Sequence, residues 1–204
     1  LIAARSAGTK RVLLAGDAGH QYIPTGGYGM NTGIADAYGA AWVIAAMIKG
    51  FGGPGLADGY KQERLPIWVY NRDAAERHNN LRVHTAGLYV SQGERLEFSG
   101  TKGDQTRAMM SAELARLGNA EAESLGIEMG YHYQGASPIV AVEPGAEVPF
   151  HPDFYTCHTV PGGRLPSLYL ANGDAVYDLL GRWFTLLAMG EADTSPAVEV
   201  ASRR

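Results

Sequence analysis

One continuous stretch near the N-terminus, residues 11–37, constrains the fold more than any other part of the chain. Its apolar run Val12–Ala15 has the composition of a strand covered on both faces, and Gly16 lets the backbone turn sharply where that strand ends. Asp17 then lies at the carboxyl edge of the predicted strand, where open α/β sheets bind ligands and where a carboxylate can accept hydrogen bonds from ribose hydroxyls. The alternative is that Asp17 only caps a turn or the following helix.

A glycine-rich loop and a helix follow directly. Residues 24–33 contain four glycines, and without Cβ atoms the backbone N–H groups of such a loop can approach a flat or anionic ligand closely. The N-terminus of the predicted helix, residues 31–49, would stabilise negative charge on that ligand. Apolar side chains recur along one face of this helix at spacings of three and four: Ile34, Ala37, Tyr38, Ala41, Ile44, Ala45 and Ile48. A glycine-rich turn without a ligand is the alternative.

Three motifs in this stretch carry a resemblance to a known family: Gly16–His20, Pro24–Gly27 and Gly29–Ala37. They resemble the second flavin fingerprint of the single-component FAD-dependent aromatic hydroxylases. These class A flavoprotein monooxygenases include the phenol and hydroxybenzoate hydroxylases. One departure is Gly19, where the family more often has alanine, and we expect this difference to matter little.

The resemblance implies a role for each motif in binding FAD. The Gly16–Asp17 pair would contact the ribityl or ribose hydroxyls through the Asp17 carboxylate. The loop that runs past the isoalloxazine ring near its reacting carbon corresponds to Pro24, Thr25, Gly26 and Gly27. The backbone amides that stabilise the pyrimidine edge of the ring correspond to Gly29, Met30 and Asn31. Pro24 is therefore the candidate catalytic position, whereas His20 is expected to pack or hydrogen-bond beneath the loop.

The resemblance also implies an activity. It predicts a monooxygenase that hydroxylates a phenolic or aromatic substrate, with FAD as cofactor and NAD(P)H and O2 as co-substrates, through a flavin C4a-hydroperoxide. Two alternatives stay open at this point. One is another flavoprotein of the superfamily, a halogenase, epoxidase or reductase, and the other is a non-catalytic scaffold or dimerisation fragment.

The predicted fold class is α/β, in three parts. Residues 1–125 are expected to be the C-terminal part of an FAD-binding domain, Rossmann-like and of glutathione-reductase type, with long helices. Residues 126–160 are expected to form a linker. Residues 161–204 resemble a partial thioredoxin-like domain, on the motifs Pro161–Pro166, Asp178–Gly181 and Phe184–Leu187. Within this part, Asn172–Gly173 between two apolar runs predicts a turn.

Too few residues precede Arg11 for the first glycine-rich βαβ unit of such a domain. We therefore expect the sequence to be the C-terminal part of a longer chain, inactive without the N-terminal remainder of the flavin domain. The resemblance further suggests that the C-terminal module contributes to homodimer contacts.

Between these parts the pattern is mainly helical. A helix is expected from Leu56, kinked or restarted at Pro66, and continuing to about Val90. A loop over residues 91–105, a helix over 106–118 and an extended segment over 127–142 are expected to follow. His78 and His84 are expected to pack on helices or lie at the surface. Arg64 is expected to form a surface or interdomain salt bridge, and the alternative is that it reaches a carboxylate or a helix end near the flavin domain.

Composition excludes several function classes. The 204 residues are 46% hydrophobic and 19% charged, as in a globular protein. The net charge of −4 and the scattered basic residues argue against a nucleic-acid surface. No apolar run suggests a membrane span, and no signal segment opens the sequence, so we expect a cytoplasmic protein. Cys157 is the single cysteine, and no metal-ligand spacing occurs.

Overall fold

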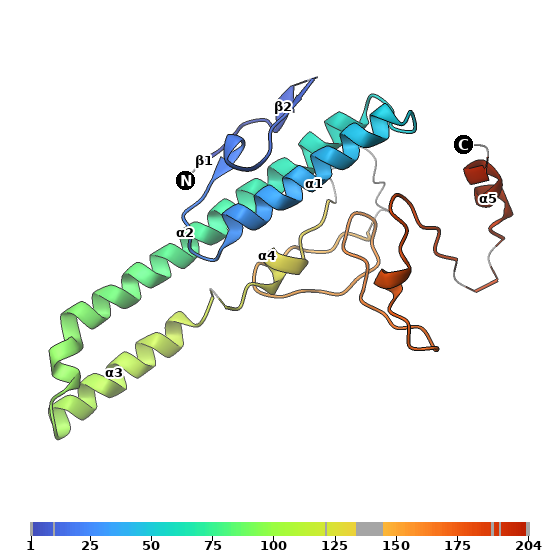
Figure 1. Cartoon of the computed structure of the whole chain (residues 1–204). Coiled ribbons are helices and arrows are strands. Elements are labelled where there is room, and N and C mark those ends of the chain that lie inside the picture. The colour runs from blue at the N-terminus through green and yellow to red at the C-terminus, as the bar shows by residue number, and fades with distance from the viewer. Residues whose placement is uncertain are drawn as a thin grey trace. The chain divides into compact units, whose positions relative to one another are not determined.

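The computed structural model describes residues 2–9, 11–120, 122–133, 145–188, 190–191 and 193–202. The chain divides into two compact units, Leu1–Arg164 and Leu165–Arg204. The described residues form a mostly helical α/β structure with a few short strands (Figure 1). The Rossmann-like and thioredoxin-like details of the predicted class, and the predicted domain bounds, stay predictions.

Four two-residue strands open the first unit. They are β1 (Ile2–Ala3), β2 (Gly8–Thr9), β3 (Val12–Leu13) and β4 (His20–Gln21), with the 3-10 turn η1 (Gly16–Ala18) between the last two. β1 pairs antiparallel with β4, and β2 pairs antiparallel with β3. The predicted strand therefore coincides with β3, but Val12 is 53% exposed. Burial on both faces is thus not found, because among the described residues β2 is the only strand that pairs with β3.

Helix α1 spans Tyr28–Ile48, three residues earlier than the predicted start. It ends at Ile48, with Lys49 as its C-cap, because Gly50, with φ of +82°, turns the backbone into the left-handed region. The predicted apolar face, however, is not the buried one: Ile34 is 60% and Tyr38 72% exposed. The face turned to the next helix, α2 (Leu56–Leu96), is instead the one that carries Thr32, Asp36, Val43 and Ala46.

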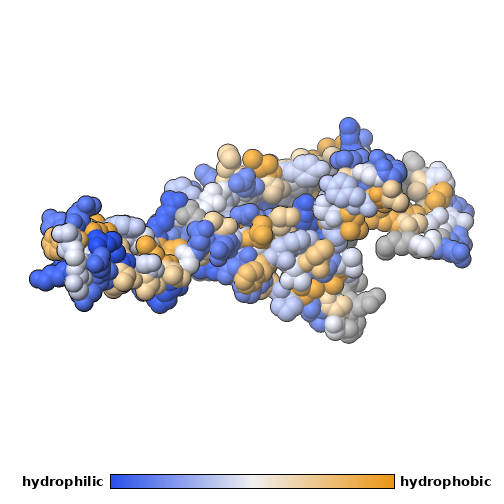
Figure 2. Space-filling view, turned by 90° about the horizontal axis from the view of Figure 1, so that it is seen from below, coloured by the Kyte–Doolittle hydropathy of each residue, from blue (hydrophilic) through white to orange (hydrophobic). Residues whose placement is uncertain are grey.

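Helix α2 is a single helix of 41 residues, Leu56–Leu96, and it lies antiparallel to α1 (Figure 1). Pro66 lies inside it, so the predicted restart there is wrong. The predicted loop over residues 91–105 is also wrong in extent, because α2 continues to Leu96 and α3 already begins at Thr101. Helix α3, Thr101–Leu117, returns along the far half of α2. The tip of this hairpin is mostly hydrophilic (Figure 2).

The core of the first unit lies where α1, α2 and the strands meet. One buried cluster contains Val43, Tyr60 and Trp68. A second contains Tyr28 of α1, Ala75 of α2 and Ile127, which lies on the short helix that follows α3. Helix α4 spans Leu125–Met129. The extended segment predicted over 127–142 is thus helical at its start, and its Ile139 and Val140 lie outside the described residues.

The chain continues without regular secondary structure at Tyr131 and Tyr133, where the Tyr133 N–H donates to the Gly162 carbonyl at 2.9 Å. The second unit has little regular structure: η2 (Val176–Leu179), α5 (Ser195–Ser202) and a single antiparallel bridge between Tyr169 and Ala175. The bridge encloses the predicted turn at Asn172–Gly173, where Gly173 has a φ of +91°. Among the described helices, none has the length and apolar character needed to cross a membrane.

Candidate functional site

The turn at Gly16 presents Asp17 at the surface. Gly16 has a φ of +57°, and Asp17 is the central residue of η1 with an exposed side chain. The turn packs against the first turns of α1 through two glycines, since a Cβ atom at Gly33 would lie only 3.3 Å from the Gly16 Cα. This contact keeps the Gly16–Ala18 backbone close to the helix.

The glycine loop closes tightly in front of α1. Pro24 is exposed and Thr25 is buried, and the Gly27 N–H donates to the Pro24 carbonyl at 3.0 Å. Gly26 and Gly27 have φ values of +82° and +72°, which residues with a Cβ atom rarely adopt. A Cβ atom at Gly26 would also lie 2.5 Å from Tyr28 Cε2. The loop conformation therefore depends on glycine at both positions.

The N-terminus of α1 has donor groups without a side-chain cap. Helix geometry leaves the Gly29 and Met30 N–H groups without an intrahelical acceptor. The Asn31 side chain donates from Nδ2 back to the Gly27 carbonyl at 2.9 Å, which ties the loop to the helix, and Met30 is 74% exposed. The positive end of the helix dipole adds to these donors. This end of α1 is thus suited to an anionic or electron-rich ligand edge.

Asp36 lies at the centre of the unit and is fully buried. Its Oδ2 accepts hydrogen bonds from His20 Nε2 at 2.7 Å and from the Gly16 N–H at 3.1 Å. Its Oδ1 accepts from Arg64 Nε at 2.7 Å and from Trp68 Nε1 at 2.9 Å. One carboxylate therefore connects the Gly16–His20 turn, α1 and α2.

The sequence reasoning did not find this network. It assigned no role to Asp36 or Trp68. For Arg64 it favoured a surface or interdomain salt bridge, whereas the structure has the alternative: Arg64 is only 4% exposed and donates to a carboxylate, that of Asp36. His20 hydrogen-bonds beneath the loop region as expected. The available signal was that Asp36 is the one charged residue in the sequence of α1.

Asp36 and Arg64 both stay ionised within this network, as the directions of their pKa shifts indicate. Burial opposes ionisation of Asp36, but the hydrogen bonds from His20 and Trp68 and the charge of Arg64 outweigh it and lower the pKa of the carboxyl group. The pKa of Arg64 is raised: burial acts against this, but Tyr133 and Asp36 favour the charged form more strongly. Asp36 and Arg64 therefore form a buried ion pair, which stays charged because each partner is hydrogen-bonded.

A pocket of about 370 Å³ opens beside the glycine loop. Its walls come from the loop and α1, from α2, and from the segment at α4; they include Gly26, Tyr28, Asn31, Arg64, Ile67, Asn71, Ile127 and Tyr131. Asp17 and Pro24 do not line it. The pocket therefore brings part of the predicted site together with α2 and α4 residues that the sequence did not suggest.

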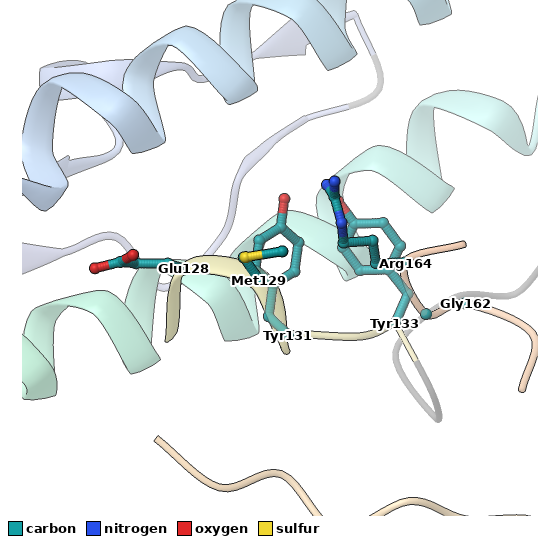
Figure 3. A pocket seen from close by; sticks show the side chains of 7 residues that line it. Glu128, Met129, Tyr131, Tyr133, Gly162 and Arg164 are labelled. Atoms are coloured by element: carbon teal, nitrogen blue, oxygen red, sulfur yellow. The ribbon is translucent and has the colours of Figure 1, made fainter. Parts of the chain in front are cut away.

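A second pocket, of about 230 Å³, shares Glu128 and Tyr131 with the first. Figure 3 shows the Tyr131 hydroxyl and the Arg164 guanidinium pointing to the same side of it. The Tyr133 hydroxyl, which also lines this pocket, accepts a hydrogen bond from Arg64 Nη1 at 3.3 Å. No cluster of metal-ligating side chains occurs among the residues that the structure describes.

Comparison with known proteins gives a consistent result. Residues 3–74 match the family model described as "FAD binding domain". The FAD-dependent monooxygenase apdD of Emericella nidulans is 39% identical over 186 residues, which cover 90% of this chain and 30% of apdD. A phenol 2-monooxygenase of Pseudomonas sp. is 30% identical over 216 residues, covering 95% of this chain and 35% of that protein.

A solved structure agrees with these relatives. The flavin-dependent monooxygenase PieE, in complex with FAD and substrate, superimposes with a TM-score of 0.70 at 29% identity, covering 88% of this chain and 34% of PieE. The chain thus spans about a third of the length of the relatives it matches.

Proposed function

Because this chain belongs to the FAD-dependent monooxygenase family, we propose that its protein hydroxylates a phenolic or other aromatic compound with NAD(P)H and dioxygen. The observation that carries the proposal is the glycine loop. It leads into a helix N-terminus without a side-chain cap and borders a pocket of about 370 Å³. The similarity to a phenol 2-monooxygenase supports an aromatic substrate.

The residues present fit FAD. A Cβ atom at Gly27 or Gly29 would meet no protein atom within 4 Å, so the backbone there is open to a ligand, and the exposed Asp17 carboxylate can accept hydroxyl hydrogen bonds from outside the turn. We propose that Gly16 and Asp17 hold the ribityl end, that Pro24, Thr25, Gly26 and Gly27 run past the isoalloxazine ring, and that Gly29, Met30 and Asn31 face its pyrimidine edge. When bound, FAD supplies the redox chemistry that activates dioxygen for transfer of one oxygen atom.

The chain contributes position and polarity. The N–H groups at the start of α1 would stabilise negative charge on the pyrimidine edge, since they are fixed donors that need no reorganisation. Pro24 is proposed as the residue nearest to the reaction, where its ring excludes water instead of exchanging a proton.

The pocket beside the loop is proposed to accept the aromatic ring of the substrate. Its volume of about 370 Å³ lies within the usual range for small-molecule sites, about 300–1,000 Å³. Ile67 and Ile127 give it apolar walls, and Asn71 and the Tyr131 hydroxyl give it polar groups that can orient a phenol. The identity of the bound aromatic compound depends on the residues that line this pocket and on any further part of the protein that covers it.

Flavin binding is tested with an Asp17→Asn variant. The whole wild-type protein that contains this chain is expected to be yellow when purified, and its apo form to quench the fluorescence of added FAD. Asp17→Asn is expected to weaken FAD binding about tenfold, because an amide accepts hydroxyl hydrogen bonds less strongly than a carboxylate. Asp58→Asn, an exposed substitution in the first turn of α2, is the matched control and should leave the affinity unchanged. Equal affinity in all three proteins would contradict the assigned role of Asp17.

The reaction is tested by oxygen uptake. Phenolic compounds of increasing ring number are expected to stimulate NAD(P)H oxidation, with one O2 consumed for each hydroxylated product. A protein that binds FAD but oxidises NAD(P)H at the same rate with and without every aromatic compound would overturn the aromatic monooxygenase proposal.

A further inference from the structure

We infer that Asp36 is a positioning residue for the flavin site: its carboxylate holds the Gly16–His20 turn so that Asp17 faces the ligand, without itself reaching that ligand. This inference rests on the proposed function, because it assigns the turn to FAD. It adds a residue in the middle of α1 to a site that otherwise consists of the turn, the loop and the helix start.

The two carboxylate oxygens of Asp36 accept hydrogen bonds from different parts of the unit. Oδ2 serves only the turn: it accepts from the Gly16 N–H at one end and from His20 Nε2 at the other, at 3.1 and 2.7 Å. Oδ1 serves only α2, through Arg64 and Trp68. The turn is therefore fixed at both ends to a group that α2 fixes in turn.

The turn has few other restraints. Besides Oδ2 it has the Gly19 N–H bond to the Gly16 carbonyl, an Ala4 N–H bond to the Gly19 carbonyl and the two-residue pairing of β4 with β1. Gly16 itself has a φ of +57° and lacks a side chain that could limit its rotation. Since Asp17 follows Gly16 directly, loss of the Gly16–Asp36 bond would change where the Asp17 carboxylate points.

The burial of Asp36 keeps its carboxylate out of reach of the ligand. Asp36 is fully buried and 20 residues beyond Gly16 in sequence, and it lies on the face of α1 turned to α2. It therefore acts on the site through the turn, not by contact. Arg64 balances its charge, so the anchor brings no unpaired charge into the core.

The test uses the whole protein that contains this chain and its Asp36→Asn variant, with Asp58→Asn as the matched control. The first measurement is hydrogen exchange of the Gly16 amide by NMR without flavin, well below the midpoint of thermal unfolding. Wild type is expected to protect this amide. Asp36→Asn is expected to raise its exchange rate about tenfold or more. Arg64 and Trp68 can only donate, so the asparagine oxygen is expected to face them, and the asparagine NH2 group, itself a donor, then faces the Gly16 N–H and leaves it without an acceptor.

The second measurement is FAD affinity in the same proteins. Asp36→Asn is expected to raise the Kd about tenfold while circular dichroism shows an intact fold, and Asp58→Asn is expected to change neither quantity. A folded Asp36→Asn protein with wild-type affinity for FAD would overturn the inference. So would fast exchange of the Gly16 amide in wild type, a result that needs no variant and stays decisive if Asp36→Asn does not fold.

The outcomes separate the two proposals. If wild type does not bind FAD, the proposed function fails, and with it the assignment of the turn to flavin, whatever the exchange rates are. If wild type binds FAD and Asp36→Asn binds it equally well, only the role of Asp36 fails.

Discussion

Replacement of Gly19 by alanine tests the packing beneath the turn. A Cβ atom at Gly19 would lie 2.5 Å from Trp68 Cη2, 2.8 Å from Cζ3 and 3.0 Å from Cζ2. The shortest of these is about 1 Å closer than the optimal carbon–carbon separation of about 3.5 Å. Sequence reasoning expected little effect at this position, because the Trp68 ring is distant in sequence and its approach cannot be seen there.

The cost follows from what holds Trp68. The indole is fully buried, donates to Asp36 and packs against Val43 and Tyr60, so it cannot retreat freely. Overpacking of this kind costs about 1–3 kcal/mol, and loss of the bond to the charged carboxylate would add about 1.5–3 kcal/mol. Because the backbone can absorb part of the overlap, we expect Gly19→Ala to lower the free energy of unfolding by about 2–4 kcal/mol.

Urea unfolding followed by tryptophan fluorescence and circular dichroism measures this loss. Trp68→Phe provides the second arm, since the smaller ring relieves the overlap. The double variant should therefore lose less stability than the two single variants together. A Gly19→Ala protein within about 0.5 kcal/mol of wild type, or strict additivity in the double variant, would refute the reasoning.

Three further predictions concern the same core. Arg64→Met leaves Asp36 charged and buried without its cation and should cost about 3–5 kcal/mol, whereas Arg77→Ala, which breaks the partly exposed pair with Asp153, should cost less than about 1 kcal/mol in the same urea assay. Because the pKa of Asp36 is lowered on folding, its contribution to stability is present above about pH 4 and is lost as the pH falls through the folded value. The free energy of unfolding of Asp36→Asn should therefore fall less steeply than that of wild type as the pH is lowered from about 5 to about 3. Tyr60→Phe removes the 2.7 Å bond from its hydroxyl to the Leu14 carbonyl and should cost about 1 kcal/mol, while Tyr38→Phe, at an exposed hydroxyl, should be neutral.

The sequence predicted those features that neighbouring residues determine. The turn at Gly16, the loop before α1, the end of that helix near Gly50 and the Asn172–Gly173 turn all follow from local backbone preferences, and the structure has each of them. The candidate flavin residues could be named for the same reason, since they form one short continuous stretch and match a fingerprint as a unit.

The features that were missed depend on contacts between distant residues. Apolar spacing indicated a buried face with Ile34 and Tyr38, but the bonds of Asp36 to Arg64 and Trp68 turn another face toward α2. The pocket walls at Asn71 and Tyr131 come from elements whose placement no local pattern specifies. The rule that proline interrupts a helix was likewise overridden at Pro66 by tertiary structure.

The continuity of α2 through Pro66 has a mechanical consequence. Proline removes one backbone bond of the helix and favours a bend at that point. Arg64 and Trp68 stand on either side of Pro66, four residues apart, and both donate to the same oxygen of Asp36. The carboxylate thus braces the helix from outside at the position where its own backbone is weakest. Loss of this brace would remove one support at Pro66, and α2 would then be held there by the contacts of its following turns, such as the Asn71 Nδ2 bond to Thr32 Oγ1 at 2.7 Å.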